Sequence, residues 1–158
     1  MISIKDILQN YKLSVLAVDE DGNSYSYSQA LSFARNIGKV YRERPLVFCL
    51  AENSIGSLMG YLSFMQNRWV ALMLDAKLDS ELLQGLVGKY QPNLIWMPDS
   101  RVQEFTNAKL IYQDYGYSLI ELNSDQIHLH TDLGLLLTTS GSTGSPKLVR
   151  LSLSLIHI

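Results

Sequence analysis

The stretch from Thr138 to Lys147 carries the residue types in this chain that are best suited to chemistry. It reads Thr-Thr-Ser-Gly-Ser-Thr-Gly-Ser-Pro-Lys, so hydroxyl side chains alternate with two glycines and a lysine closes the run. Glycine lets backbone N–H groups turn inward and approach an anion closely, and hydroxyl groups add donors that match phosphate oxygens. The lysine supplies a mobile positive charge, which suits a polyphosphate that must move or leave. These residue types predict a cradle for the terminal phosphates of a nucleotide.

Composition alone leaves another interpretation open, because a Ser/Thr/Gly-rich stretch between two strands is usually a plain connector. The stretch does not fit the pattern Gly-x-x-x-x-Gly-Lys-Ser/Thr, since Lys147 does not directly follow a glycine. It does not fit the Gly-x-Gly-x-x-Gly turn of dinucleotide-binding proteins either. The order of the residues must therefore decide between a phosphate cradle and a simple loop.

Two apolar runs must hold this stretch in place. The run from Leu133 to Leu137 predicts a strand that leads into it, and the run from Leu148 to Leu151 predicts a returning strand. Other short apolar runs predict strands at residues 46–50, 69–74, 94–97, 110–112 and 117–122. The first three of these are apolar throughout, as is typical of strands that are covered on both faces.

Amphipathic segments lie between the predicted strands. After a short leading helix at residues 3–10, helices are expected to begin at Ser28, at Asn53 or Ser54, and at Asp79 or Ser80. The inward-facing residues of the first and last of these three helices are predicted to be Ala30, Leu31, Phe33, Ala34, Ile37 and Val40, and Leu82, Leu83, Leu86 and Val87. Strands that alternate with helices predict an α/β fold, in which helices flank a parallel sheet.

Composition and charge exclude several classes of protein. The chain has 158 residues and a net charge of −2, with no basic face that would indicate a nucleic-acid partner. No apolar stretch reaches the roughly 18 residues of a membrane span. The single Cys49 lies in the apolar run of residues 46–50 and is predicted to be a buried, inert thiol. With no signal peptide at the N-terminus, these features predict a cytoplasmic protein.

Two other groups of residues invite a metal-binding interpretation. His128 and His130 would lie on one face of an extended segment, but no cysteine is nearby, so a solvated pair is the favoured interpretation. The acidic segment from Asp19 to Asn23 resembles the start of a calcium loop but lacks its closing glutamate, which favours a plain turn. Trp69 and Trp96 are expected in the core or at its rim.

The order of residues from Thr139 to Lys147 resembles the phosphate-loop signature of the adenylate-forming superfamily. This superfamily includes acyl-CoA synthetases, adenylation domains of peptide synthetases and luciferases, and its signature is close to Thr/Ser-Ser/Gly-Gly-Ser/Thr-Thr-Gly-x-Pro-Lys. Weaker similarity runs from Tyr25 to Ser152, with gaps around residues 98–130. The chain departs from the family pattern at four positions: Arg68 and Leu148 stand where glycine is frequent, and Met73 and Ala76 stand where proline is frequent.

The resemblance implies an ATP-dependent reaction in which a carboxylic acid becomes an acyl adenylate, with Mg²⁺ accompanying the nucleotide. The acyl group would then pass to a thiol of coenzyme A or of a carrier-protein phosphopantetheine. Lys147 would be the catalytic residue, because it would help to neutralise the leaving pyrophosphate. The residues implied to hold the β- and γ-phosphates, together with Lys147, are Thr139, Ser140, Gly141, Ser142, Thr143 and Gly144.

The resemblance also implies a domain boundary. Residues 1–152 are expected to be the N-terminal part of an AMP-binding (adenylation) domain, without the family's later motifs, so the chain alone is predicted to be inactive. Residues 153–158 read Leu-Ser-Leu-Ile-His-Ile, which can be encoded by DNA that resembles a transposon end used as a sequencing adapter, and are predicted to be a non-native tail. A genuine apolar strand end is the alternative for the tail. For the whole chain, the alternatives are a non-catalytic nucleotide- or phosphate-binding module and a pseudo-enzyme fragment.

Overall fold

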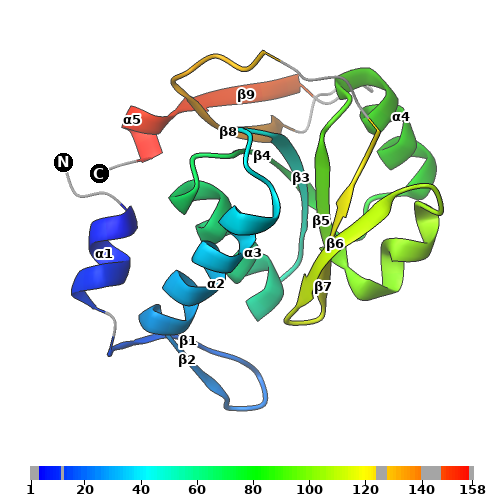
Figure 1. The fold of residues 1–158 in the computed structure, drawn as a ribbon. Helices are drawn as coiled ribbons and strands as arrows, with labels where there is room; N and C mark the ends of the chain where they lie inside the picture. The colour runs from blue at the N-terminus through cyan, green and yellow to red at the C-terminus, as the bar shows by residue number, and fades with distance from the viewer. Residues whose placement is uncertain (1–3, 12, 124–127, 140–146, 157–158) are drawn as a thin grey trace.

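The structure is a computed structural model that describes residues 4–11, 13–123, 128–139 and 147–156. Within these residues, seven strands form one sheet in the order β6-β7-β5-β3-β4-β8-β9 (Figure 1). The central strands β3 (Leu46–Ala51), β4 (Val70–Asp75), β5 (Leu94–Pro98) and β8 (Leu133–Thr139) run parallel to one another. The outer strands β6 (Lys109–Asp114), β7 (Tyr117–Glu121) and β9 (Lys147–Ser152) pair antiparallel with their neighbours.

Helices cover both faces of this sheet. The helices α1 (Ile4–Asn10), α2 (Tyr27–Val40) and α3 (Ile55–Gln66) pack on one face, and α4 (Ser80–Tyr90) packs on the other (Figure 1). A separate hairpin of β1 (Val15–Val18) and β2 (Ser24–Ser26) precedes α2. The short helices η1 (Asp99–Glu104) and α5 (Leu153–Ile156) follow β5 and β9. The predicted α/β architecture is therefore confirmed.

The sheet differs from the prediction at one end, where β6 and β7 form an antiparallel hairpin. Its turn is formed by Tyr115 and Gly116, whose φ angles are 52° and 72°. Two successive residues with positive φ are typical of a type I′ turn, which matches the twist of the flanking strands. The sheet is therefore mixed, and only its central strands have the parallel arrangement that alternation with helices predicts.

The core lies on both sides of the central strands. On β3, Val47 and Cys49 face α2 and α3, whereas Phe48 and Leu50 face α4. All four side chains are fully buried, which explains why the strand is apolar throughout. Burial raises the pKa of Cys49 to about 12, so the predicted inert thiol is confirmed.

The predicted helix starts are correct for α3 and α4 but wrong for α2. Ser54 and Asp79 cap α3 and α4 as expected. The N-cap of α2 is Ser26, not Ser28: the Ser26 Oγ accepts the Gln29 N–H at 3.2 Å, and the Gln29 Oε1 accepts the Ser26 N–H at 2.7 Å. This reciprocal capping box satisfies two backbone donors, one more than Ser28 could satisfy alone.

Two residues predicted to face inward are exposed instead. Leu82 is 43% exposed because it lies at the edge of the α4 face that carries the buried Leu83 and Leu86. Val40 is 37% exposed at the last residue of α2. The two tryptophans are in the core as predicted, with Trp69 2% and Trp96 0% exposed.

Candidate functional site

The predicted phosphate-binding stretch connects β8 to β9. These strands pair antiparallel, and Thr139 at the end of β8 lies opposite Lys147 at the start of β9. The structure therefore brings together the two ends of the signature, which are eight positions apart in the sequence. The predicted site residues between them, Ser140, Gly141, Ser142, Thr143 and Gly144, lie outside the described residues, as do the side chains of Thr139 and Lys147.

The connection leaves the sheet at the carboxyl ends of the parallel strands. Leu137 on β8 pairs with Met73 on β4, and two residues further along, at Thr139 and Asp75, the two strands end. Neighbouring strands lie about 4.8 Å apart, so the ends of β4 and β8 are adjacent. Ligands of open α/β sheets bind outside these carboxyl ends, and the ends of the two strands that the stretch connects, at Thr139 and Lys147, lie at this edge.

A hydroxyl network fixes the start of α3 at the same edge. The Ser54 Oγ accepts the Ser57 N–H at 3.3 Å, and the Ser57 Oγ accepts the Glu52 N–H at 2.9 Å. The hydroxyls of Ser57 and Tyr117 are hydrogen-bonded at 2.7 Å, and burial is the main cause of the raised pKa of Tyr117. Because its hydroxyls already have partners, this group holds α3 in place and is not a nucleophile that awaits activation.

Close packing against β5 and β7 also holds α3 in place. The Trp96 Nε1–H donates to the Gly56 carbonyl at 3.0 Å. A Cβ atom at Gly56 would lie 2.3 Å from the Tyr117 ring, and one at Gly60 would lie 2.2 Å from the Trp96 Nε1. The two glycines therefore let the helix approach β5 and β7 closely, which sets the position of its N-terminus at this edge.

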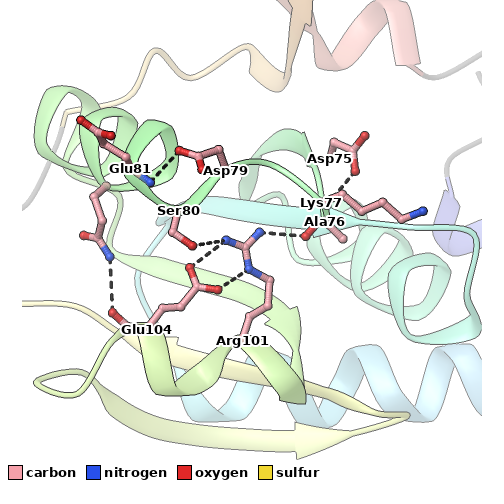
Figure 2. Close-up of polar contacts among 9 residues, drawn as sticks. Asp75, Ala76, Lys77, Asp79, Ser80, Glu81, Arg101 and Glu104 are labelled. Atoms are coloured by element: carbon pink, nitrogen blue, oxygen red, sulfur yellow. Dashed lines mark hydrogen bonds and ion pairs between the residues drawn. The ribbon is translucent and has the colours of Figure 1, made fainter.

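Arg101 ties together the connections that follow β4 and β5. Its Nε and Nη2 donate to the two carboxylate oxygens of Glu104 at 2.6 and 2.7 Å, and its Nη1 donates to the Ala76 carbonyl at 2.8 Å (Figure 2). The bond to Glu104 raises the pKa of Arg101, and the same bond holds the pKa of Glu104 below its usual value. The sequence analysis did not single out this pair, although the spacing of three residues within one short helix could have suggested it.

A cleft of about 600 Å³ opens at the same edge, between the β1–β2 turn and the start of α3. Its lining includes Asp21, Glu52, Asn53 and Met73. The β1–β2 turn closes on Asp19, whose carboxylate accepts the N–H groups of Asp21 and Asn23 at 3.1 and 2.8 Å. These hydrogen bonds fix the backbone of the turn between β1 and β2.

No metal cluster is found in the described part of the chain, where no group of three or more His, Cys, Asp or Glu residues could hold an ion. His128 and His130 are exposed, and the His130 Nδ1 accepts the Asp132 N–H at 3.2 Å. Among the described residues, no helix has both the length and the apolar character needed to cross a membrane.

Solved structures of several adenylation domains and related enzymes have a fold similar to that of this chain. The adenylation domain AlmE of Vibrio cholerae, solved with glycyl-adenosine-5'-phosphate, matches with a TM-score of 0.72 and 15% identity over 98% of this chain and 35% of that one. The luciferase-like enzyme of the mealworm Zophobas morio matches with a TM-score of 0.69 and 16% identity over 95% of this chain and 41% of that one. ATP-bound MatB from Rhodopseudomonas palustris matches with a TM-score of 0.68 and 18% identity, over 96% of this chain and 35% of that one.

Sequence comparison gives a consistent but more distant similarity. A curated polyketide synthase–nonribosomal peptide synthetase from Aspergillus clavatus is 21% identical over 154 residues, which cover 91% of this chain. The chain spans 4% of that protein's length. No protein-family model matches the chain. The resemblance to adenylate-forming enzymes is thus confirmed at the level of the fold, over a part of such enzymes.

Proposed function

We propose that this chain contributes the phosphate-binding hairpin of an ATP-dependent enzyme that activates a carboxylic acid as an acyl adenylate. One observation carries the proposal: the nine-residue signature that ends at Lys147 spans a hairpin at the carboxyl edge of a sheet with the adenylate-forming fold. MatB was solved with ATP, AlmE with glycyl-adenosine-5'-phosphate, and a fatty acyl-adenylate ligase of L. pneumophila with an acyl adenylate and pyrophosphate. Neither the signature nor the fold alone would name the reaction, because a fold hosts many activities.

The donors of the signature suit the proposed role. Its hydroxyls and backbone N–H groups would bind the β- and γ-phosphates of ATP, which brings Mg²⁺ with it. Thr139 and Lys147 pair across β8 and β9, so the two ends of the signature lie at the same edge of the sheet. Its positive charge would stabilise the pyrophosphate as it leaves, which is an electrostatic role and not that of a base.

The second half of the reaction and the domain boundary are further parts of the proposal. The acyl group would pass to the thiol of coenzyme A or of a carrier-protein phosphopantetheine, as in the family that the signature resembles. Residues 1–152 would form the N-terminal part of an adenylation domain that needs later segments for activity, and residues 153–158 would be a non-native tail. Reading the source DNA beyond the codon for Ser152 tests the last point, because a native coding frame would there depart from Leu-Ser-Leu-Ile-His-Ile.

The test of the catalytic proposal is Lys147→Ala in the complete protein. We expect acid-dependent exchange of pyrophosphate into ATP to fall about 100-fold, since removing one electrostatic donor at a developing charge costs about that much. Lys39→Ala is the matched control, because Lys39 is an exposed lysine near the end of α2 and should leave the rate unchanged. Circular dichroism would confirm that both variants fold.

Two outcomes would contradict the proposal. An unchanged exchange rate in Lys147→Ala would remove the catalytic assignment of that residue. A complete protein that binds pyrophosphate but forms no adenylate with any acid would instead favour a non-catalytic phosphate-binding module.

A further inference from the structure

The two outermost strands of the sheet differ in the charges that they carry. Among the described residues, β6 pairs only with β7 and β9 pairs only with β8, so each leaves one side of its backbone without a strand partner. β6 begins with Lys109 and ends with Asp114, whereas β9 carries Lys147 and Arg150 and has no acidic residue. An antiparallel copy of β6 would therefore bring opposite charges together, and an antiparallel copy of β9 would not.

A bulge in β6 places both of its terminal charges on one face of the sheet. Lys109 pairs with Glu121 and Asp114 pairs with Tyr117, and these two β7 residues are an even number of positions apart. Such residues share a face, and so do residues directly opposite each other on paired strands. A regular strand would put Lys109 and Asp114 on opposite faces, but the register shift within β6 adds one residue between them. Both charges consequently lie on the face covered by α2, because Tyr117 belongs to the buried cluster on that face.

A groove of about 260 Å³ lies beside Asp114, between β6 and α2. Its lining includes the polar side chains of Ser32 and Asn36 and the rings of Phe33 and Tyr115, and Asp114 is the only charged residue among its described lining. The Asp114 Oδ1 accepts the Tyr115 N–H at 2.9 Å, which orients the carboxylate. A lysine from another chain could lay its aliphatic stem along the rings while its ammonium group reaches this carboxylate.

Lys109 is accessible for such a contact. Its side chain is 76% exposed, and its Nζ lies 3.8 Å from the Glu121 Oε2, which makes a weak surface ion pair. A carboxylate of a second chain could therefore replace Glu121 at little cost. The neighbouring Leu110 is 50% exposed, so β6 also presents apolar surface that a second strand would cover.

We propose that β6 pairs antiparallel with β6 of a second copy of this chain, with Lys109 of each copy opposite the partner's Asp114. The two-fold axis then lies between Ile111 and Tyr112, and each ion pair occurs twice. Charges on an edge strand discourage pairing with an unrelated strand but favour a strand with complementary charges at matching positions. The interface does not depend on the proposed reaction, because β6 and the β8–β9 hairpin lie on opposite sides of the sheet.

The test is sedimentation velocity of the complete protein at roughly 1–200 μM, where a small interface should give a monomer–dimer equilibrium. Lys109→Glu and Asp114→Lys each replace two attractive contacts with two repulsive ones, so each should raise the dimer Kd at least about tenfold. An equimolar mixture of these two variants should associate with a Kd within about threefold of the unaltered protein, because every mixed pair again has opposite charges. Lys77→Glu is the control, since it makes the same charge change at an exposed residue after β4 and should leave the Kd unchanged.

Three outcomes would overturn this inference. The unaltered protein could remain monomeric over the whole concentration range. It could dimerise while Lys109→Glu and Asp114→Lys dimerise equally well, which would show that the copies meet elsewhere. The two variants could each be monomeric, fold normally by circular dichroism and still fail to associate in the mixture, which would exclude the antiparallel pairing. None of these results bears on the proposed function, which is tested by exchange of pyrophosphate into ATP.

Discussion

An arginine lies at each end of the parallel strands, and the two arginines have different hydrogen-bond partners. At the amino ends, Arg44 donates to the carbonyls of Arg68 and His130 at 2.8 and 3.0 Å and also to the carbonyl of Leu133, which joins the segments entering β3, β4 and β8. At the carboxyl ends, Arg101 donates two hydrogen bonds to Glu104, one to the Ser80 Oγ and one to the Ala76 carbonyl. Burial lowers the pKa of Arg44, whereas the bond to Glu104 raises the pKa of Arg101.

The side chains at the amino ends of the parallel strands stabilise the fold, whereas several at the carboxyl ends are exposed to solvent. At the amino edge, polar groups such as those of Arg44 and Asn93 are directed at the main chain. At the carboxyl edge, Glu52, Asn53 and Lys77 are exposed around connections whose backbones are already fixed. Exposed side chains on connections with a fixed backbone are typical of binding sites in α/β sheets.

The largest expected effect is at Arg44. Arg44→Leu would leave three carbonyls without their charged donor, and we expect the free energy of unfolding to fall by about 2–4 kcal/mol. Urea unfolding followed by circular dichroism measures this change. Arg42→Leu is the control, because Arg42 is exposed and should change stability by less than about 0.5 kcal/mol. Equal stability of the two variants would show that the amino edge is not held by Arg44.

The next effect compares an asparagine at each edge. The buried Leu46 N–H donates to the Asn93 Oδ1 at 3.0 Å, so Asn93→Ala would leave a buried donor unsatisfied. We expect a loss of about 1–3 kcal/mol in the free energy of unfolding. Asn53→Ala at the carboxyl edge removes an exposed amide and should cost less than about 0.5 kcal/mol. A loss at Asn53 as large as that at Asn93 would break the distinction between the two edges.

A smaller effect depends on pH and concerns Glu104. The bond to Arg101 depresses the pKa of Glu104 in the folded state, so its stabilisation is present above its unfolded value near 4.5 and is lost as pH falls through the folded pKa. Between pH 7 and pH 3, the unaltered chain should therefore lose about 1 kcal/mol more stability than Glu104→Gln does. Glu20→Gln, which alters an exposed carboxylate, should follow the pH dependence of the unaltered chain. Identical pH profiles for all three proteins would mean that the Arg101–Glu104 pair adds no stability.

The sequence predicted well where one local rule determines the structure. Short apolar runs at residues 46–50, 69–74 and 94–97 can be buried on both faces only as central strands, and that is their place. The starts of α3 and α4 were predicted to within one residue, at Asn53 or Ser54 and at Asp79 or Ser80, and the caps are Ser54 and Asp79. Ser26 and Ser28 are both candidate N-caps of α2, and Ser26 is the cap because it forms the reciprocal capping box with Gln29.

The prediction was incomplete where tertiary contacts decide. The direction of β6 and β7 depends on the Tyr115–Gly116 turn, which lacks the usual Asn-Gly or Asp-Gly signal. The role of Arg101 depends on a carbonyl 25 positions away in the sequence, at Ala76.

The smallest expected effect is a gain in stability from a substitution at Arg68, which lies at the amino edge. Arg68 has a φ of 58°, in the left-handed region that favours glycine, and glycine is frequent at this position in the family that the signature resembles. We expect Arg68→Gly to raise the free energy of unfolding by about 0.5–1 kcal/mol, because it relieves that strain and removes a positive charge that lowers the pKa of Arg44. Arg68→Ala removes the same charge but keeps the Cβ atom, so the difference between the two variants in urea unfolding isolates the backbone term. If Arg68→Ala is as stable as Arg68→Gly, the strain relieved by glycine is no larger than the entropy that glycine adds to the unfolded chain, and any gain in both variants comes from removing the charge beside Arg44.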